Sequence, residues 1–384
     1  MNFLVVGAGL SGGVIARVLA EHGNQVIIWD RRNHIGGNMH DYVDEHGILV
    51  HKYGPHTFHT KNKVLYQFMQ RFADWTPYYL KCGAVIQGQF TPTPFNFKTI
   101  DQFYSMELAF KLKRRLIEYF KGRSNATVVD VLDSSDDIIR EYGEFLFKND
   151  YSIYTAKQWG ISPDEVDPSI LKRVPIRFSY DEGYFDDEFQ VMPAISYNDF
   201  FKNILNHPNI NINLQIDALD YLKVDNEDKQ ILVNGKVEED LIVIFTGALD
   251  ELFGLDSGRL PYRSLKFEWH YENKDSFQPY PVVAYPLEKY TRVTEYNKLP
   301  IQHGRGTSYA MEYAIMYDPT KKQEPYYPLL TEESLNRAEI YKSRANALKN
   351  FYYCGRLADY KYYNMDQALE RAIDVAYKIL SREK

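Results

Sequence analysis

The chain has 384 residues, which is enough for two or three domains with a sizeable core. Lys and Arg together number 45 and Asp and Glu 52, and the resulting net charge of −7 argues against non-specific nucleic-acid binding, which needs a net basic surface. A composition of 45% hydrophobic and 25% charged residues excludes a disordered chain, and two widely spaced cysteines, Cys82 and Cys354, predict neither a disulfide framework nor a thiolate zinc site.

The first thirty residues alternate between strand and helix patterns around a glycine-rich turn. An apolar strand at 3–6 leads into Gly-Ala-Gly-Leu-Ser-Gly-Gly at 7–13, a helical pattern follows, and a second apolar strand ends in Asp30. Small residues let the backbone approach a pyrophosphate at the N-terminus of a helix, where free N–H groups favour anions. An acidic side chain after the second strand accepts hydrogen bonds from an adenosine ribose. The spacing therefore predicts a Rossmann-like dinucleotide site at Gly7, Gly9, Gly12 and Asp30.

A second glycine pair and a late strand–glycine–helix pattern favour FAD over NAD as the dinucleotide. Gly36 and Gly37 follow the second strand and resemble the extension found in glutathione-reductase-type flavoproteins. Near the end of the chain, a strand at 350–354, Gly355 and a helix at 366–379 resemble the unit that closes over the ribityl phosphate in such proteins. We therefore expect the chain to leave the FAD-binding domain and re-enter it.

The segments between the two ends predict a helical part and a sheet-rich part. Residues 101–150 carry apolar side chains at helical spacing, with a last helix ending near Asn149, whereas 210–246 and 264–296 have strand patterns. We predict an α/β fold: a Rossmann-like FAD-binding domain, an inserted helical domain and an antiparallel β-sheet substrate domain. The predicted boundaries are 1–76, 196–246 and 328–384 for the FAD-binding domain, 101–165 for the helical domain, and 77–100, 166–195 and 247–327 for the substrate domain.

Arginine and tyrosine recur together in polar segments of the middle and late chain. Tyr154 and Trp159 lie in one such segment, Arg173 in the next and Arg292 in a third, all in sequence that is typical of loops. Guanidinium groups bind a diphosphate through paired hydrogen bonds, tyrosine hydroxyls add neutral donors, and an aromatic ring can stack on a nucleobase. Taken singly, an arginine more often forms a surface ion pair and an aromatic residue more often packs in the core, so only their joint occurrence favours a binding site.

These motifs together resemble the bacterial flavin-dependent UDP-galactopyranose mutases. The resemblance covers nearly the whole chain, and Tyr-Gly-Pro-His-Thr-Phe-His-Thr at 53–60 and Lys-Gln-Trp-Gly at 157–160 are far more specific than the glycine fingerprint. The other matching motifs are the glycine turn at 7–14, Arg-Asn-His-Ile-Gly-Gly-Asn at 32–38, Leu-Lys-Arg-Val-Pro-Ile-Arg-Phe at 171–178, Tyr-Thr-Arg at 290–292, Tyr-Tyr-Pro at 326–328 and Gly-Arg-Leu at 355–357.

The resemblance implies an isomerase that interconverts UDP-galactopyranose and UDP-galactofuranose without net redox. In the family, N5 of reduced FAD attacks the anomeric carbon and displaces UDP, and the flavin–sugar adduct opens, recloses through O4 and recaptures UDP. The family also implies a cellular flavin reductant, a homodimer and a product destined for a cell-surface galactofuranose polymer. Neither a signal-peptide pattern nor a run of 18 apolar residues occurs, so we expect a cytoplasmic protein without a membrane span.

The resemblance also implies residue roles, carried over by motif. Arg173, Arg292 and His59 are the implied catalytic residues, and the segment that holds Arg173 is expected to form a mobile lid. The implied substrate-binding residues are Tyr154, Trp159, Arg173, Tyr184, Arg292, Tyr327, Tyr362 and Asn364. The implied FAD-binding residues are Gly7, Gly9, Ser11, Gly12, Asp30, Arg31, Gly37, Asn38, His56, His59, Arg356 and Met365. A lone histidine more often has a structural role, which applies to His56 more than to His59.

The chain departs from the family pattern at one residue and lacks an anchor in one segment. Asn364 stands where the family usually carries Asp, and it keeps one oxygen acceptor but loses the charge. Residues 301–324 contain no motif that fixes the match. Both features bear on which sugar is the substrate more than on which reaction is catalysed.

Three alternatives stand beside UDP-galactopyranose mutase. The first keeps the ring-contraction chemistry but acts on UDP-N-acetylgalactosamine or dTDP-fucose. The second is an ordinary FAD oxidoreductase such as an amine oxidase, which shares the glycine motifs but does not explain the set of Arg173, Arg292 and tyrosines. The third is a nucleotide-sugar binding protein without catalysis.

Overall fold

Five parallel strands form a sheet in the order β12–β2–β1–β16–β22 in the computed structural model, which describes residues 1–159, 175–302, 304–321 and 323–382. Each neighbouring pair is parallel, so every connection must cross over the sheet. The strands are β1 (Asn2–Val6), β2 (Gln25–Asp30), β12 (Ile210–Leu214), β16 (Leu241–Phe245) and β22 (Phe351–Tyr353).

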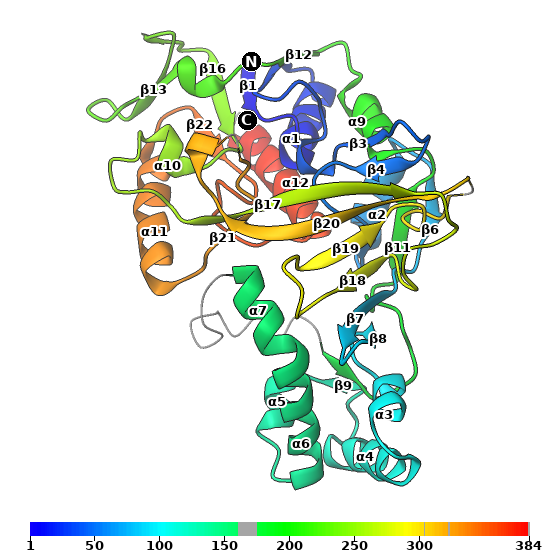
Figure 1. Ribbon diagram of the computed structural model, residues 1–384. Coiled ribbons are helices and arrows are strands. Elements are labelled where there is room, and N and C mark those ends of the chain that lie inside the picture. The colour runs from blue at the N-terminus through cyan, green and yellow to red at the C-terminus, as the bar shows by residue number, and fades with distance from the viewer. Residues whose placement is uncertain (160–174, 303, 322, 383–384) are drawn as a thin grey trace.

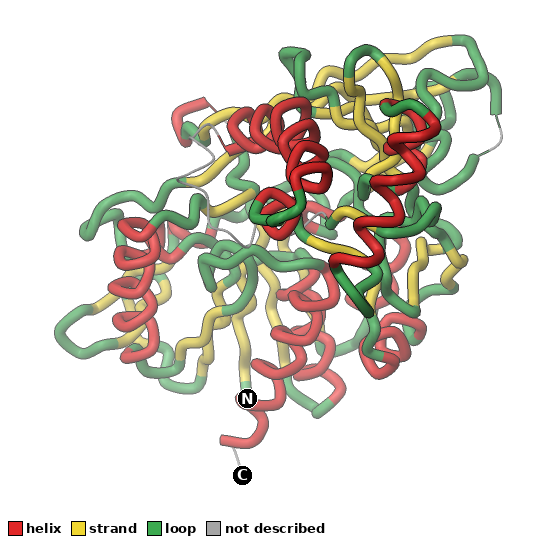
Figure 2. The backbone as a smooth tube through the Cα atoms, turned by 90° about the horizontal axis from the view of Figure 1, so that it is seen from below, coloured by secondary structure: helices red, strands yellow, loops and turns green. Residues whose placement is uncertain are grey.

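Alternate side chains of β1 enter two different hydrophobic cores, because successive residues of a strand point to opposite faces. Phe3 and Val5 belong to the core formed with α1, α2, α9 and α12, and Leu4 belongs to the core formed with α10, α11 and a three-stranded meander. The helices are α1 (Leu10–Glu21), α2 (Lys63–Gln70), α9 (Tyr197–Leu205), α10 (Leu249–Leu252), α11 (Glu332–Ala347) and α12 (Met365–Arg382), and the meander is β13 (Leu222–Asp225), β14 (Gln230–Val233) and β15 (Lys236–Val237). β1 begins and α12 ends on the same side of the molecule (Figure 1, Figure 2).

A group of helices projects from the sheets at the bottom of Figure 1 and has a core of its own. It contains α3 (Phe97–Phe103), α4 (Met106–Tyr119), α5 (Val128–Leu132), α6 (Asp137–Leu146) and α7 (Ser152–Trp159), together with the short antiparallel pair β9 (Asn125–Ala126) and β10 (Ile176–Arg177). A π-helical turn, Phe147–Tyr151, joins α6 to α7. The helix predicted to end near Asn149 therefore continues, and Tyr154, expected in a loop, lies on a helix.

A seven-stranded sheet lies between these helices and the parallel sheet in Figure 1. Its order is β21–β17–β20–β19–β18–β7–β8, and all neighbours are antiparallel except β18 and β7. The strands are β7 (Cys82–Ile86), β8 (Gln89–Thr93), β17 (Tyr262–Glu272), β18 (Val282–Ala284), β19 (Arg292–Glu295), β20 (Thr307–Met316) and β21 (Tyr327–Pro328). Two small sheets complete the fold: β5 (Phe58–Thr60), β11 (Phe189–Pro193) and β6 (Trp75–Pro77), and β3 (Asp41–Val43) with β4 (Leu49–His51).

The predicted fold class is confirmed, since a Rossmann-like parallel sheet, a helical part and a largely antiparallel sheet are all present. The division into domains at the stated boundaries stays a prediction. Within the described ranges, none of the helices combines the length and apolar character that a membrane span requires.

Candidate active site

Two neighbouring cavities share part of their walls. The first is lined by the β1–α1 turn, the ends of β2 and β16 and the start of α12. The second is lined by residues of β7, β18 and β19, the π-helical turn and α7. The residues that line both are Asn38, His56, Tyr326, Arg356, Tyr363, Asn364 and Met365. Ligands bound in the two cavities would therefore lie next to each other at this junction.

The turn between β1 and α1 forms part of the first cavity and has no room for larger residues. A Cβ atom on Gly12 would lie 1.9 Å from the carbonyl oxygen of Gly7. Gly7, Gly9, Ser11 and Gly12 all line the cavity. Because the first N–H groups of a helix have no partner within it, the start of α1 is suited to bind phosphate.

Asp30 ties the end of β2 to the glycine turn. The side chain is buried, and its two carboxylate oxygens accept hydrogen bonds from the backbone N–H of Ala8 at 2.7 Å and of Arg32 at 2.8 Å. A carboxylate oxygen can accept more than one hydrogen bond, so Asp30 keeps acceptor capacity toward the cavity that it lines.

The second glycine pair lies directly against the first glycine motif. Gly37 has a φ of 55°, and a Cβ atom on it would lie 2.9 Å from the Cα of Gly9. The next residue, Asn38, accepts a hydrogen bond from Arg32 at 2.9 Å. The two glycine motifs therefore form one continuous surface of the first cavity, as the dinucleotide prediction requires.

An ion-pair cluster stands at another edge of the first cavity. Arg31 and Arg32 both donate to Glu324, at 3.2 and 2.8 Å, and Arg31 also lies 3.8 Å from Glu251. Burial opposes the charge of both arginines, but Glu324 outweighs it and raises the pKa of each above its ordinary value. Arg31 lines the cavity, and its guanidinium pairs with carboxylates of the chain itself.

Arg356 organises the junction between the two cavities. It donates to the carbonyl oxygen of Tyr363 at 2.8 Å, and its guanidinium lies 5.3 Å and 5.2 Å from the ring centres of Tyr327 and Tyr362. Those two rings stack with centres 5.3 Å apart. Asn364 follows at once, and its carbonyl oxygen accepts the N–H of Ala368 in the first turn of α12. The junction therefore combines a fixed guanidinium, two phenol rings and a helix N-terminus.

An ion pair between a partly buried arginine and a buried glutamate lies in the second cavity. Nε and Nη2 of Arg292 each lie 2.9 Å from the same carboxylate oxygen of Glu312, whose side chain is 1% exposed. Burial lowers the pKa of Arg292, but Glu312 more than compensates and raises it well above the ordinary value. Arg292 is thus a permanent cation, and within the described ranges its other N–H groups contact no acceptor of the chain.

Several tyrosines line the second cavity with Arg292. Burial raises the pKa of Tyr154, and burial together with Tyr362 raises the pKa of Tyr327 to about 12. Both hydroxyls therefore stay protonated at neutral pH and can donate hydrogen bonds. Tyr184 and Tyr362 line the same cavity.

The two predicted histidines have different environments. Nδ1 of His56 lies 2.8 Å from the carbonyl oxygen of Gly54, so Nδ1 carries the proton, and burial lowers the pKa of His56 to about 4. His56 is thus a neutral ring at the junction of the cavities. His59 lines the second cavity, where its Nδ1 pairs with Asp187 at 2.8 Å and its ring stacks on Phe185.

Lys157 connects α7 to the loop that precedes β19. Its ammonium donates to the carbonyl oxygens of Tyr285, Glu288 and Tyr290 at 2.6, 2.7 and 2.8 Å. All three N–H groups are therefore used. Burial lowers the pKa of Lys157 to about 8. This contact fixes the helix that carries Tyr154 relative to the strand that begins with Arg292.

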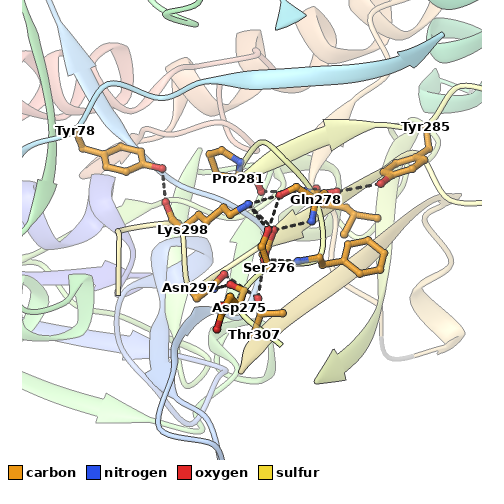
Figure 3. Close-up of polar contacts among 12 residues, drawn as sticks. Tyr78, Asp275, Ser276, Gln278, Pro281, Tyr285, Asn297, Lys298 and Thr307 are labelled. Carbon is orange, nitrogen blue, oxygen red and sulfur yellow. Dashed lines mark hydrogen bonds and ion pairs between the residues drawn. The ribbon is translucent and has the colours of Figure 1, made fainter. Parts of the chain in front are cut away.

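A buried polar network supports the other end of β19 (Figure 3). Glu295 is fully buried and accepts hydrogen bonds from the backbone N–H groups of Phe277 and Gln278 and from Thr307. Lys298 lies 3.1 Å from the Glu295 carboxylate and also donates to Ser276 at 2.6 Å. The strand that carries Arg292 is therefore held at both ends.

Comparison with known proteins identifies the family. A family model described as UDP-galactopyranose mutase matches residues 149–362, more than half of the chain, and one described as an NAD(P)-binding Rossmann-like domain matches residues 5–72. The UDP-galactopyranose mutase of Mycoplasma genitalium is 34% identical over 99% of this chain and 95% of its own length. The chain belongs to the UDP-galactopyranose mutase family.

Two further matches extend this result. The dTDP-fucopyranose mutase of Escherichia coli is 36% identical over 99% of both chains. A crystal structure of reduced UDP-galactopyranose mutase has a TM-score of 0.74 and 15% identity over 99% of this chain and 95% of that one, which supports the shared fold. As a member of this mutase family, the chain is an isomerase.

Most of the residues implied by the family motifs line one of the two cavities. The exceptions are at the end of α7 and in the segment after it. Arg173 lies outside the described residues, and so does the side chain of Trp159, although its backbone ends α7. The roles of all these residues stay predictions.

Sequence reasoning missed several residues that shape the site of this mutase-family member. Glu312 and Glu324 come from segments without a recognised motif, and Asp150 and Lys157 received no role. One signal was available for Glu312, because it is a charged residue within the otherwise uncharged strand Thr307–Met316. A charge at such a position is buried only when it has a partner.

Proposed function

We propose that this chain interconverts UDP-galactopyranose and UDP-galactofuranose, with FAD as its cofactor. The observation that carries the proposal is the pair of Arg292 with the buried Glu312, which lies among tyrosine side chains in a cavity that shares part of its wall with the first cavity. Such an arrangement suits a reaction in which a nucleoside diphosphate must leave a sugar, stay bound and return.

The first cavity fits FAD because its glycine cradle has no space for side chains and Asp30 stands at the end of β2. When bound and reduced, FAD would supply a nucleophilic ring nitrogen to the anomeric carbon. The residues that would hold it are Gly7, Gly9, Ser11, Gly12, Asp30, Arg31, Gly37, Asn38, His56, His59, Arg356 and Met365.

Arg292 would bind the diphosphate of the substrate and stabilise the charge of the departing nucleotide. Two of its nitrogens contact Glu312, which fixes the plane of the guanidinium and leaves further N–H groups for phosphate oxygens. Tyr327 and Tyr362 would add neutral donors, and Arg173 would add a second guanidinium. Tyr184 and Asn364 complete the proposed contacts, and Tyr154 and Trp159 would hold the uridine.

The two histidines would bind, position or transfer protons, and neither would transfer electrons. His56 is neutral, so Nε2 is a hydrogen-bond acceptor at the junction of the cavities. Asp187 holds the ring of His59 in one orientation, which suits a residue that positions a group or transfers a proton. Of the two histidines, we assign the catalytic role to His59.

The proposal is tested with purified, FAD-loaded protein and UDP-galactofuranose, with and without dithionite. We expect chromatography to show UDP-galactopyranose only with reduced protein, and no reductant consumed per turnover. Oxygen or NAD(P)H consumption in step with product would instead support an oxidoreductase. Binding without conversion by the reduced protein would indicate a nucleotide-sugar binding protein.

A second candidate substrate is dTDP-fucose. It is favoured by the 36% identity to a dTDP-fucopyranose mutase and by Asn364, which lines both cavities without the charge that is usual in the family. Turnover of UDP-galactofuranose, dTDP-fucofuranose and the furanose form of UDP-N-acetylgalactosamine by one preparation decides between them. The highest kcat/KM identifies the substrate.

The partners follow from the same proposal. The enzyme would need a cellular flavin reductant, would form a homodimer and would work in the cytoplasm. Size-exclusion chromatography with light scattering tests the homodimer directly, and a monomer at working concentration would contradict it.

A further inference from the structure

A buried carboxylate closes the loop between β22 and α12. Asp359 lies in this loop and is 8% exposed. Its Oδ2 accepts hydrogen bonds from the backbone N–H of Gly355 at 3.0 Å and from the hydroxyl of Tyr363 at 3.3 Å. The backbone N–H of Asp359 donates in turn to the carbonyl oxygen of Gly355 at 2.8 Å. One side chain therefore joins the first and last residues of the loop 355–363.

The same carboxylate ties this loop to α12. Nη2 of Arg371 donates to Oδ1 of Asp359 at 3.0 Å, and Nε of Arg371 donates to Oδ2 at 3.3 Å. Two N–H groups of a guanidinium on the two oxygens of a carboxylate fix the orientation of both groups as well as their distance. Four donors thus converge on Asp359, which gives this buried charge the partners that it requires.

The residues that this loop carries to the junction give Asp359 its importance. Arg356, Tyr363, Asn364 and Met365 line both cavities, whereas Asp359 is not among the described residues that line either one. Arg356 donates to the carbonyl oxygen of Tyr363 at 2.8 Å, so its guanidinium depends on the end of the loop that Asp359 holds. Asn364 and Met365 follow directly and begin α12. Asp359 therefore acts on the junction through its neighbours.

The junction is also the end of the first cavity at which the flavin would lie. Asp30, Arg31 and Asp217 line the first cavity alone, and Asp30 is suited to the adenosine ribose. The reacting ring must reach a substrate in the second cavity, so it must lie where the cavities meet. A guanidinium and a helix N-terminus both favour negative charge there. Reduction adds electrons to the ring, so these groups stabilise reduced flavin more than oxidised flavin.

We propose that Asp359, through its pair with Arg371, is a positioning residue that holds Arg356 and the start of α12 in place for the reduced flavin. It acts through the loop 355–363 and not by contact with the cofactor. The inference rests on the proposed function for the identity of the cofactor. It adds to that function a means by which this chain favours the reduced flavin, the form that the reaction needs.

The test measures the midpoint potential of the bound flavin in the FAD-loaded, full-length protein by reductive titration against a reference dye. Asp359→Asn keeps the size of the side chain and an acceptor for Gly355, but it loses the ion pair with Arg371. We expect reduced flavin to lose about tenfold more affinity than oxidised flavin, which makes the potential about 30 mV more negative for a two-electron couple.

The sign of this shift distinguishes positioning from the charge of Asp359 itself. Removing a negative charge at a distance makes a nearby flavin easier to reduce, so the charge alone would move the potential of Asp359→Asn to a more positive value. Loss of positioning moves it to a more negative value. An unchanged or more positive potential in flavin-loaded Asp359→Asn would overturn the proposal.

Arg371→Gln breaks the same pair from its more exposed side. Arg371 is 35% exposed, so the chain should tolerate this substitution even where Asp359→Asn folds poorly. We expect its potential to become more negative as well, and an unchanged value would again overturn the proposal. The double variant should shift no further than the larger of the two single shifts, because both remove one interaction. Additive shifts would contradict the assignment of the effect to the pair.

Two controls separate this inference from other outcomes. Glu295→Gln weakens another buried carboxylate network, in the antiparallel sheet, and should keep the wild-type potential. A shift as large as that of Asp359→Asn would show that Asp359 is only structural. Turnover of UDP-galactofuranose by the reduced wild type is measured on the same preparation. Turnover without the shift in Asp359→Asn would overturn the inference alone, and the shift without wild-type turnover would overturn the proposed function alone.

Discussion

The two cavities differ in how the chain builds them. Much of the first comes from one continuous stretch, β1 to Asn38, in which backbone conformation and small residues create the surface. The second is assembled from side chains of β7, β18, β19, the π-helical turn and the loop before α12, which are far apart in sequence. A site built from backbone depends on residues that have small side chains or none. A site built from side chains depends on the partner residues that orient those side chains.

The largest effect should come from Arg292→Ala, which removes the central side chain of the second cavity. We expect kcat/KM for UDP-galactofuranose to fall by about 10²–10³-fold, because a charge that stabilises the departing diphosphate is lost. The substitution also leaves Glu312 buried and unpaired, so unfolding is measured in parallel. Arg292→Lys is the matched control, since it keeps the charge without the planar fork, and full activity in it would argue against bidentate binding.

Gly12→Ala should have the next largest effect and acts on the first cavity alone. Its Cβ atom would lie 1.9 Å from a carbonyl oxygen, so the turn must move, and we expect flavin content per protein to drop by about tenfold or more. Gly13→Ala is the control, because the nearest atom to its Cβ lies 3.6 Å away. Similar flavin content in the two variants would show that the glycine turn does not limit cofactor binding.

Glu295→Gln tests whether the second cavity depends on distant support. The substitution removes the charge that accepts hydrogen bonds from Phe277, Gln278 and Thr307, and we expect about 2–3 kcal/mol less stability in denaturant unfolding. The exposed Glu268→Gln should change stability by less than about 0.5 kcal/mol. If both variants unfold alike, the network of Figure 3 is not what holds β19.

The smallest effect is expected for Asn364→Asp, at the junction of the cavities. Asp is as good as Asn at the start of a helix, so stability should stay within about 1 kcal/mol. The ratio of kcat/KM for UDP-galactofuranose to that for dTDP-fucofuranose should change, by less than about tenfold. An unchanged ratio would exclude Asn364 as the cause of any substrate preference.

The same contrast explains what the sequence could predict. The glycine motifs, Asp30 and the late helix are local signals, because each local conformation admits few residue types. The partners Glu312 and Glu324 come from segments without a motif, and only the folded chain brings them to Arg292 and to the Arg31–Arg32 pair. The sequence predicts a loop at Tyr154 because it gives no sign that a π-helical turn continues α6 into α7.

That turn has a consequence for how the substrate wall can change. A π-helix closes its hydrogen bonds over one residue more than an α-helix does, so the turn at Phe147–Tyr151 adds one residue to the winding. A chain shortened by one residue there would run from α6 into α7 as a single α-helix, with the later side chains in nearly the same rotational phase, because the wider turn absorbs the extra residue. Tyr154 and Lys157 would then keep nearly their present directions. The extra residue of this turn is therefore one that the wall can lose without being reoriented.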